Sequence, residues 1–283
     1  MKTIDTLVKD IYDVVEGKGG WDEAVTEFFS SGMADVARSR LEAEQGGRSG
    51  TLRLSGMGAP CRKKLWYDVN EPDGGETLPP SARLKFLYGD ILEHMLISLA
   101  IAAGHRVEGC QDELYVHGIK GHRDCVIDGI SVDVKSASPY SFKKFEAGGL
   151  RDDDPFGYIS QLSSYVYAGR EHEVESHPSV GAFLVIDKVN GKLCLDMYDF
   201  SLEMKTKEED FEEIKQMVAE SEPPPRGFDP VPEGKSGNEK LGINCSYCSR
   251  KADCWPKLRT FVSSRGPLYL TTVKREPRMK EVT

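Results

Sequence analysis

The chain has no run of eighteen apolar residues, and its first twenty residues, MKTIDTLVKDIYDVVEGKGG, carry acids instead of a continuous apolar stretch. A membrane-spanning helix needs at least about eighteen apolar residues, and a secretion signal needs an apolar core. The sequence therefore predicts neither kind of segment, and we expect a cytoplasmic protein with no membrane partner.

Excess positive charge is also missing, because the 283 residues carry a formal net charge of −9. Unspecific affinity for nucleic acid comes from neutralising phosphates, so this balance excludes a protein that coats nucleic acid indiscriminately. Basic residues nevertheless gather in places. Residues 250–283 hold nine Lys or Arg against three Asp or Glu, and shorter basic runs lie at 61–64 (CRKK) and 142–145 (FKKF). Such runs can border a groove in an acidic body.

Internal repeats and low-complexity blocks are absent, so the fold is predicted from single elements. Helical periodicity fills residues 1–48 up to a QGGRSG break, and a Pro/Gly-rich connector spans 221–242. Between them the pattern predicts helices at 83–105, 154–169 and 205–220, and strands at 113–119, 122–128, 130–138, 181–189 and 192–200. This order favours an α/β fold with a mixed sheet flanked by helices.

Seven cysteines, an odd number in a chain without a predicted secretion signal, do not indicate a disulfide framework. Cys245, Cys248 and Cys254 follow a C-x2-C-x5-C spacing that is typical of a metal clamp. A tetrahedral metal site or a cubane cluster takes four protein ligands, so this trio lacks one. The remaining cysteines of the predicted core, at 110, 125 and 194, are interpreted as small buried hydrophobes.

The run GHRDCVIDGISVDVKS, residues 121–136, carries the clearest chemical signal. If it forms two strands turned at residue 129, Asp133 and Lys135 share one face of the second strand, and Val134 points into the core. Asp124 or Asp128 can join them from the first strand. Asp128 precedes the turn glycine and takes the structural role, which leaves Asp124 for chemistry. Carboxylates and the Val134 carbonyl are the hard oxygen ligands that Mg²⁺ or Mn²⁺ prefer.

The motifs GHRD, VDVK and QLSSY, in this order, resemble the PD-(D/E)xK nuclease superfamily in its RecB-like branch. The resemblance implies a restriction-endonuclease-like fold in which Asp124 and Asp133 bind metal and Lys135 is the catalytic lysine. It also implies that Gln161 and Tyr165, four residues apart on one helix face, contact the substrate near the scissile phosphate.

The same resemblance places a metal ligand on the preceding helix, four residues after a glycine. Glu93 has this spacing from Gly89, and His94 follows it directly. Neighbours on a helix differ by about 100° in direction, so only one of the two can face the metal. We expect Glu93, a hard oxygen ligand, with His94 as the alternative.

Cys61, in the run CRKKLWY, lies 184 positions before Cys245. One cysteine before the core and a C-x2-C-x5-C trio after it resemble the iron-sulfur RecB-like nucleases, including CRISPR-associated and AddB-type exonucleases. Arg62 stands where that family has proline. The resemblance implies that Cys61 is the fourth ligand of a structural [4Fe-4S] cluster that ties the terminal segments together. Zinc is the alternative, because four thiolates also make a closed zinc site.

The domain division expected from these motifs is an N-terminal helical segment at 1–54, a nuclease core at 55–220, and a linker with the cysteine cluster and a basic tail at 221–283. The resemblance implies an enzyme, a Mg²⁺- or Mn²⁺-dependent deoxyribonuclease acting as an exonuclease on single-stranded DNA or DNA ends. The alternatives are a single-strand or flap endonuclease with the same active site, and a non-catalytic zinc-stapled subunit that binds DNA ends. A homo-oligomer is compatible with each.

Overall fold

The computed structural model describes residues 2–42, 50–263 and 266–282, so most of the predicted QGGRSG break and Arg265 of the basic tail lie outside the described residues. A five-stranded mixed sheet forms the centre, in the order β1-β4-β5-β6-β7. The parallel pair β5 and β6 is flanked by antiparallel neighbours on both sides. Its strands are β1 (Val107–Glu108), β4 (Cys125–Ile127), β5 (Ile130–Ala137), β6 (Val180–Asp187) and β7 (Leu193–Asp199).

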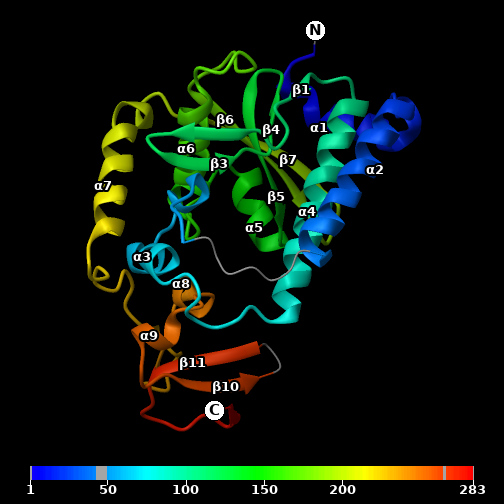
Figure 1. The fold of residues 1–283 in the computed structure, drawn as a ribbon. Helices are drawn as coiled ribbons and strands as arrows, with labels where there is room; N and C mark the ends of the chain where they lie inside the picture. The colour runs from blue at the N-terminus through cyan, green and yellow to red at the C-terminus, as the bar shows by residue number, and fades with distance from the viewer. Residues whose placement is uncertain (1, 43–49, 264–265, 283) are drawn as a thin grey trace.

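Helices cover both faces of this sheet, which confirms the predicted mixed α/β architecture (Figure 1). One face packs against α1 (Leu7–Asp13) and α4 (Pro80–Ala102), and α2 (Glu23–Ala37) lies outside α4. The opposite face packs against α5 (Pro139–Glu146) and α6 (Tyr158–Gly169). The parallel connection from β5 to β6 runs through α5 and α6, as a crossover between parallel strands requires.

Alternation along the central strands divides the core into two apolar layers. Val132 and Val134 of β5 belong to the layer under α1 and α4, whereas Ala137 joins the layer under α5 and α6. A separate two-stranded hairpin of β2 (Glu113–Val116) and β3 (Ile119–His122) packs on α6. Beyond it lie α3 (Arg62–Asn70) and α7 (Lys207–Ala219), which pack against each other.

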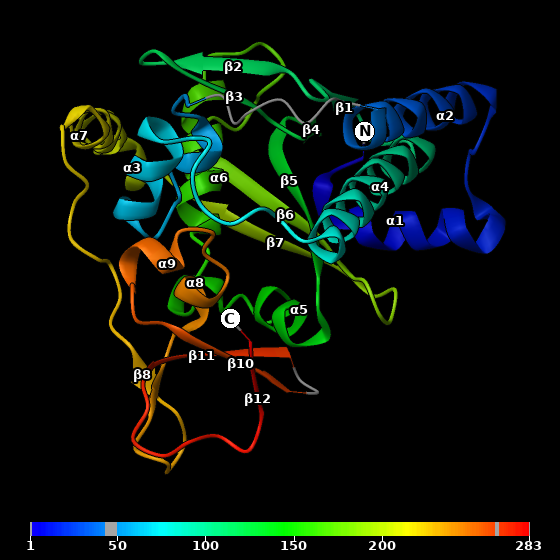
Figure 2. The same ribbon diagram turned by 60° about the horizontal axis from the view of Figure 1, so that its bottom comes forward.

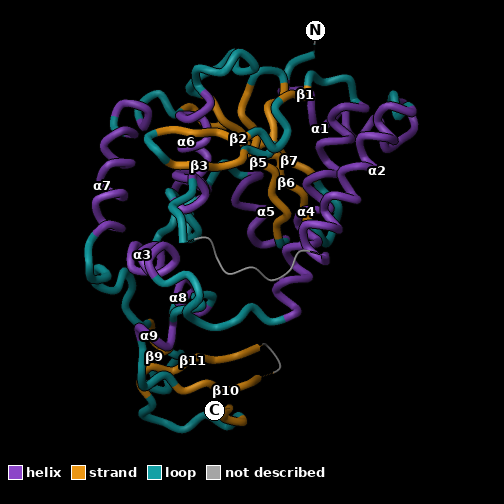
Figure 3. The backbone as a smooth tube through the Cα atoms, in the orientation of Figure 1, coloured by secondary structure: helices purple, strands orange, loops and turns teal. Residues whose placement is uncertain are grey.

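The C-terminal part of the chain forms a second five-stranded sheet, below the central sheet in the view of Figure 3, in the order β12-β10-β11-β9-β8. No strands are predicted there from the sequence, because apolar residues are few in this part of the chain and do not alternate regularly over a long stretch. Their bounds are β8 (Val231–Pro232), β9 (Glu239–Lys240), β10 (Arg259–Ser263), β11 (Gly266–Thr272) and β12 (Lys280–Val282). Two short helices, α8 (Ile243–Ser246) and α9 (Lys251–Cys254), lie between this sheet and α3 (Figure 2).

No helix among the described residues is both long enough and apolar enough to cross a membrane.

Candidate active site and cysteine cavity

The candidate active site lies at the edge of β5, where the neighbouring strand β4 ends. The ladder between the two strands stops at the pair Cys125 and Val132, so Val134 has no partner on β4. The Asp124 carboxylate stands in for the missing strand partner and accepts a hydrogen bond from the Val134 N–H at 2.8 Å. Because the N–H and C=O of one strand residue face the same edge, the Val134 carbonyl also points toward Asp124. An oxygen-rich edge results.

Asp133 and Lys135 share the other face of β5, as their alternation predicts. Asp133 is buried, and its carboxylate forms an ion pair with the Lys135 ammonium. Burial alone lowers the pKa of Lys135, but Asp133 and Asp124 raise it above its usual value, so the lysine is charged at neutral pH. The Nζ atom lies 5.3 Å from the centre of the Tyr158 ring, which holds the ammonium by a cation–π contact.

Glu93 reaches this edge from α4, on the opposite side of the sheet from Lys135. Burial, reinforced by the charges of Asp124 and Asp133, raises the pKa of Glu93 to about 9. Burial and the charge of Asp133 raise the pKa of Asp124 to about 7. Three carboxylates thus lie close enough to repel one another, and a bound cation would relieve this repulsion.

His94, the alternative ligand, faces away from this edge. Its ring stacks on Phe28 of α2 with the centroids 4.9 Å apart, and Nε2 lies 3.1 Å from the Phe28 carbonyl. Gly32 leaves room for the ring, since a Cβ atom there would lie 2.0 Å from the imidazole. The structure therefore brings Glu93, and not His94, to Asp124 and Asp133.

Gln161 and Tyr165 lie on α6, on the same side of the sheet as Lys135. Tyr165 is buried, and burial with the charge of Asp124 raises its pKa to about 12, which keeps the phenol neutral. The Gln161 side chain, one helical turn away, lowers this pKa in opposition to burial. At the start of the helix Gly157 meets Gly58 so closely that a Cβ on Gly157 would lie 1.6 Å from the Gly58 carbonyl oxygen. The chain leading to Cys61 therefore crosses directly over α6.

Asp128 occupies the turn between β4 and β5 with a left-handed backbone, φ 52°, beside Gly129 with φ 82°. Its carboxylate accepts a hydrogen bond from the Arg106 N–H at 3.0 Å and lies 2.7 Å from Nδ1 of His105. These contacts hold it in the turn, away from Asp124 and Asp133.

A groove of about 720 Å³ between α2 and α4 opens onto this site. Glu93 and Asp124 form one end of it, and Asp35 and Asp90 add further negative charge. Arg40 and His94 are the basic side chains among the described residues that line it, and Arg40 forms an ion pair with Asp90. The groove gives access to small ions, and its charge favours cations over anions.

The donor set of this site fits a hard divalent cation. The available donors are the oxygen atoms of three acids and one backbone carbonyl, and Oδ2 of buried Asp133 is the atom that pairs with the Lys135 ammonium. As the side chains stand, no three His, Cys, Asp or Glu residues in 2–42, 50–263 and 266–282 are drawn together closely enough to hold a metal ion. Binding therefore requires the carboxylates to move inward.

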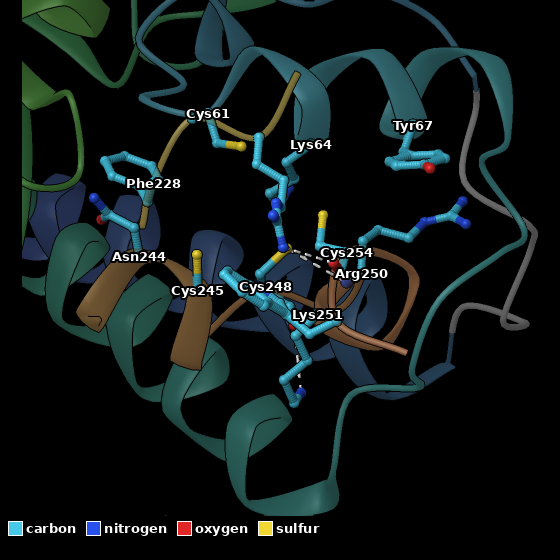
Figure 4. A pocket seen from close by; sticks show the side chains of 13 residues that line it. Cys61, Lys64, Tyr67, Phe228, Asn244, Cys245, Cys248, Arg250, Lys251 and Cys254 are labelled. Carbon is cyan, nitrogen blue, oxygen red and sulfur yellow. Dashed lines mark hydrogen bonds between the residues drawn. The ribbon is translucent and has the colours of Figure 1, made fainter. Parts of the chain in front are cut away.

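Cys61 and the three cysteines of the C-x2-C-x5-C trio line a single cavity of about 30 Å³. Cys61 precedes α3 and enters from one side, whereas Cys245, Cys248 and Cys254 enter from α8 and α9 on the other (Figure 4). The structure therefore brings together four residues that are separated by most of the chain.

Burial, followed by the neighbouring thiols, raises the pKa of Cys245 to about 11. Burial likewise raises the pKa of Cys248 and Cys254 above the usual value of a thiol. Without a cation these groups are neutral thiols, and metal binding has to displace their protons.

Hydrogen-bond donors and positive charges surround these sulfurs. The Arg250 N–H donates to Sγ of Cys248 at 3.4 Å. The buried Nε1 of Trp255, also on the cavity wall, has no well-directed acceptor among the described residues, and it lies close enough to Cys245 to lower the pKa of that thiol. Lys64 and Lys63 lower the pKa of Cys248 and Cys254 in opposition to burial. The surroundings thus favour thiolates over thiols once a metal is bound.

The three other cysteines are placed differently. Cys125 is fully buried in the apolar layer under α4, and Cys110 and Cys194 are partly buried against the apolar core. None of the three lines the cysteine cavity, in agreement with the role of small hydrophobes.

Two residues near the active site were missed by the sequence analysis. Tyr158 lies three residues before Gln161 on the same helix stripe, a spacing that is visible in the sequence. Gln111 donates a hydrogen bond from Nε2 to Oε1 of Glu93 at 2.8 Å. It lies in a loop without periodicity, so no sequence pattern identifies it.

Comparisons with known proteins add little. No protein-family model matches the chain, and no curated protein matches it. Among solved structures, the crystal structure of SSO0001 superposes with a TM-score of 0.38 and 18% identity, over 81% of this chain and 96% of that one. A likeness at this level carries no argument about fold or function.

Proposed function

We propose that this protein is a divalent-cation-dependent deoxyribonuclease with a restriction-endonuclease-like core. The observation that carries the proposal is the cluster of Glu93, Asp124 and Asp133 beside the charged Lys135, at the point where β5 loses its neighbour. Clustered carboxylates with raised pKa values destabilise the folded state, and they mark functional sites more often than structural ones. The motif resemblance GHRD, VDVK and QLSSY supports the same chemistry.

Each residue then has a defined task. Glu93, Asp124, Asp133 and the Val134 carbonyl hold Mg²⁺ or Mn²⁺, which polarises the phosphate and activates water when bound. Lys135 offers an ammonium that orients water and balances the negative charge developing on the phosphate. Gln161 and the neutral Tyr165 phenol supply hydrogen bonds to the substrate from α6.

The proposed substrate is single-stranded DNA with a free end, degraded exonucleolytically, and this part rests on the family resemblance. The acidic groove supports a requirement for a bound cation, because phosphates meet negative charge there unless metal neutralises it. Weak binding at physiological salt is expected, since few unpaired cations lie at the site.

The test is digestion of linear and circular single-stranded DNA in Mn²⁺, with a sample in chelator as the control. Loss of the linear substrate alone supports an exonuclease, and loss of both supports an endonuclease with the same active site. Both substrates intact in Mn²⁺ and in Mg²⁺ would overturn the proposal and favour a binding subunit.

We further propose that the cysteine cavity holds a structural [4Fe-4S] cluster. The choice of a cluster over a single zinc ion rests on the family resemblance of the C-x2-C-x5-C spacing, because four thiolates can hold either group. The single cavity that all four cysteines line supports one shared site. Anaerobic purification with visible absorption and metal analysis tests this: iron at about four atoms per chain supports the cluster, and zinc with a colourless protein contradicts it.

A further inference from the structure

The loop between β1 and β2 has an unusual backbone. Gly109 and Gln111 both adopt left-handed conformations, with φ 59° and φ 57°. Glycine at 109 is required, because a Cβ atom there would lie 2.7 Å from Nη2 of Arg123. Glutamine has no such reason to be at 111, since left-handed backbone favours Gly, Asn or Asp. A strained backbone of this kind persists only where the surroundings impose it, and it often occurs beside functional sites.

Hydrogen bonds fasten this loop to the segment that carries Asp124. The Gln111 N–H donates to the Asp124 carbonyl at 3.1 Å, and the Arg123 N–H donates to the Asp112 carbonyl at 3.2 Å. The Arg123 guanidinium, almost fully buried, bonds the Asp112 carboxylate at 2.8 Å and the Glu175 carboxylate at 2.8 Å. The backbone of Gln111 is therefore fixed relative to Asp124.

The side chain of Gln111 extends from this fixed point to α4. Its Nε2 donates to Oε1 of Glu93 at 2.8 Å, while Oε2 of Glu93 has no hydrogen-bond partner within the described residues. One residue thus joins the backbone of Asp124 to the carboxylate of Glu93, which belong to different elements of the fold. Gln111 therefore holds Oε1 of Glu93 and leaves Oε2 available to bind a cation.

We propose that Gln111 is a positioning residue that fixes the Glu93 carboxylate relative to Asp124 for cation binding. The inference rests on the proposed metal site. Without the amide, the Glu93 side chain can turn freely within the groove that it and Asp124 both border, and it is no longer fixed relative to Asp124. Partners that orient a metal ligand change metal affinity by about 10- to 100-fold when they are removed.

The decisive variant is Gln111→Asn. Asparagine accepts the left-handed backbone at least as well as glutamine, but its side chain is one methylene shorter and cannot reach Glu93. His117→Asn is the matched control, because His117 also has a left-handed backbone, φ 50°, and packs on Tyr167 instead of the site. Both variants exchange a longer side chain for asparagine at the same kind of backbone position.

Mn²⁺ affinity is measured by calorimetry on the full chain, together with the midpoint of thermal unfolding in chelator. We expect Gln111→Asn to weaken Mn²⁺ binding at least about 10-fold with an unchanged unfolding midpoint, and His117→Asn to keep the wild-type affinity whatever its midpoint. In cleavage assays the activity of Gln111→Asn should return at higher Mn²⁺ concentration.

Wild-type affinity in Gln111→Asn would overturn the inference while leaving the metal site intact. Failure of the wild-type protein itself to bind Mn²⁺ would instead overturn the proposed function. If Gln111→Asn does not fold, Gln111→Gly removes the same amide and keeps the backbone conformation, and the same affinity comparison applies.

Discussion

The carboxylate site and the cysteine cavity differ in how the chain builds them. Glu93 lies on the long helix α4, Asp133 on β5, and Asp124 directly before β4, and these elements pack together with or without a ligand. Cys61 and the trio at 245–254 lie at short helices on opposite sides of a cavity, and ion pairs of Arg250 with Glu71 and of Lys251 with Glu76 also join the two sides. The first site therefore rests on a long helix and paired strands, whereas the second rests on short segments and side-chain contacts that a bound ligand would reinforce.

We therefore expect substitutions at the two sites to have different effects. A substitution at the carboxylate site should reduce catalysis without unfolding the protein, because the surrounding helices and strands remain in place. A change at the cysteine cavity should affect stability first, because four ligands joined across the chain close a very long loop.

The largest expected effect is that of Lys135→Ala on cleavage. Loss of the ammonium removes a positive charge from beside the reacting phosphate, and we expect the rate to fall by about 100- to 1000-fold. Lys188→Ala, an exposed lysine at the end of the neighbouring strand β6, is the control and should keep wild-type activity. Because Lys135→Ala also leaves Asp133 without its ion pair, the unfolding midpoint is measured in Mn²⁺. Comparable rates for the two variants would contradict the assignment.

A structural effect is expected from Cys248→Ala. Without this ligand the cluster no longer joins α3 to α8 and α9, and the loop-closure argument gives a loss of about 5 kcal/mol in the free energy of unfolding. Cys194→Ala, on β7 and outside the cavity, should cost about 1 kcal/mol. Anaerobic urea unfolding measures both. Equal losses in the two variants would show that the cavity does not tie the segments together.

A third expected effect concerns the pH dependence of stability. The pKa of Glu93 is about 9 in the folded protein against an ordinary 4.5, so the metal-free native state binds an extra proton between these values. Stability should therefore fall as the pH rises from about 5 to 9. Glu93→Gln cannot ionise, and its unfolding midpoint should exceed that of the wild type by a margin that grows with pH.

The control for this pH effect is Glu173→Gln, an exposed glutamate for which the described residues provide no ion pair. Its midpoint should follow the wild type throughout. Parallel curves for Glu93→Gln and the wild type from pH 6 to 9 would mean that Glu93 is not held among like charges.

The sequence alone predicted the parts of the structure that depend on local pattern. Alternation placed Asp133 and Lys135 on one face of β5, and the Asp-Gly pair correctly marked the turn at Asp128. Helical spacing placed Gln161 and Tyr165 on one stripe of α6. These features follow from the periods of strands and helices, which a sequence displays directly.

Other features depended on contacts between distant segments. The different placements of Glu93 and His94 depend on the stacking of His94 on Phe28, a contact between two helices. Gln111 lies in an irregular loop, and its importance arises from hydrogen bonds to two other elements. The strands β8 to β12 are short, and their pairing joins segments whose own patterns are weak.

One measurement tests the central claim most directly, namely calorimetric titration of Mn²⁺ into the wild type, Asp133→Asn and Asp196→Asn. Asp133 and Asp196 are both buried strand aspartates of the central sheet, and only Asp133 lies at the carboxylate cluster. The account predicts saturable Mn²⁺ binding to the wild type and Asp196→Asn, and its loss in Asp133→Asn. Equal binding by all three proteins, or none by the wild type, would contradict it.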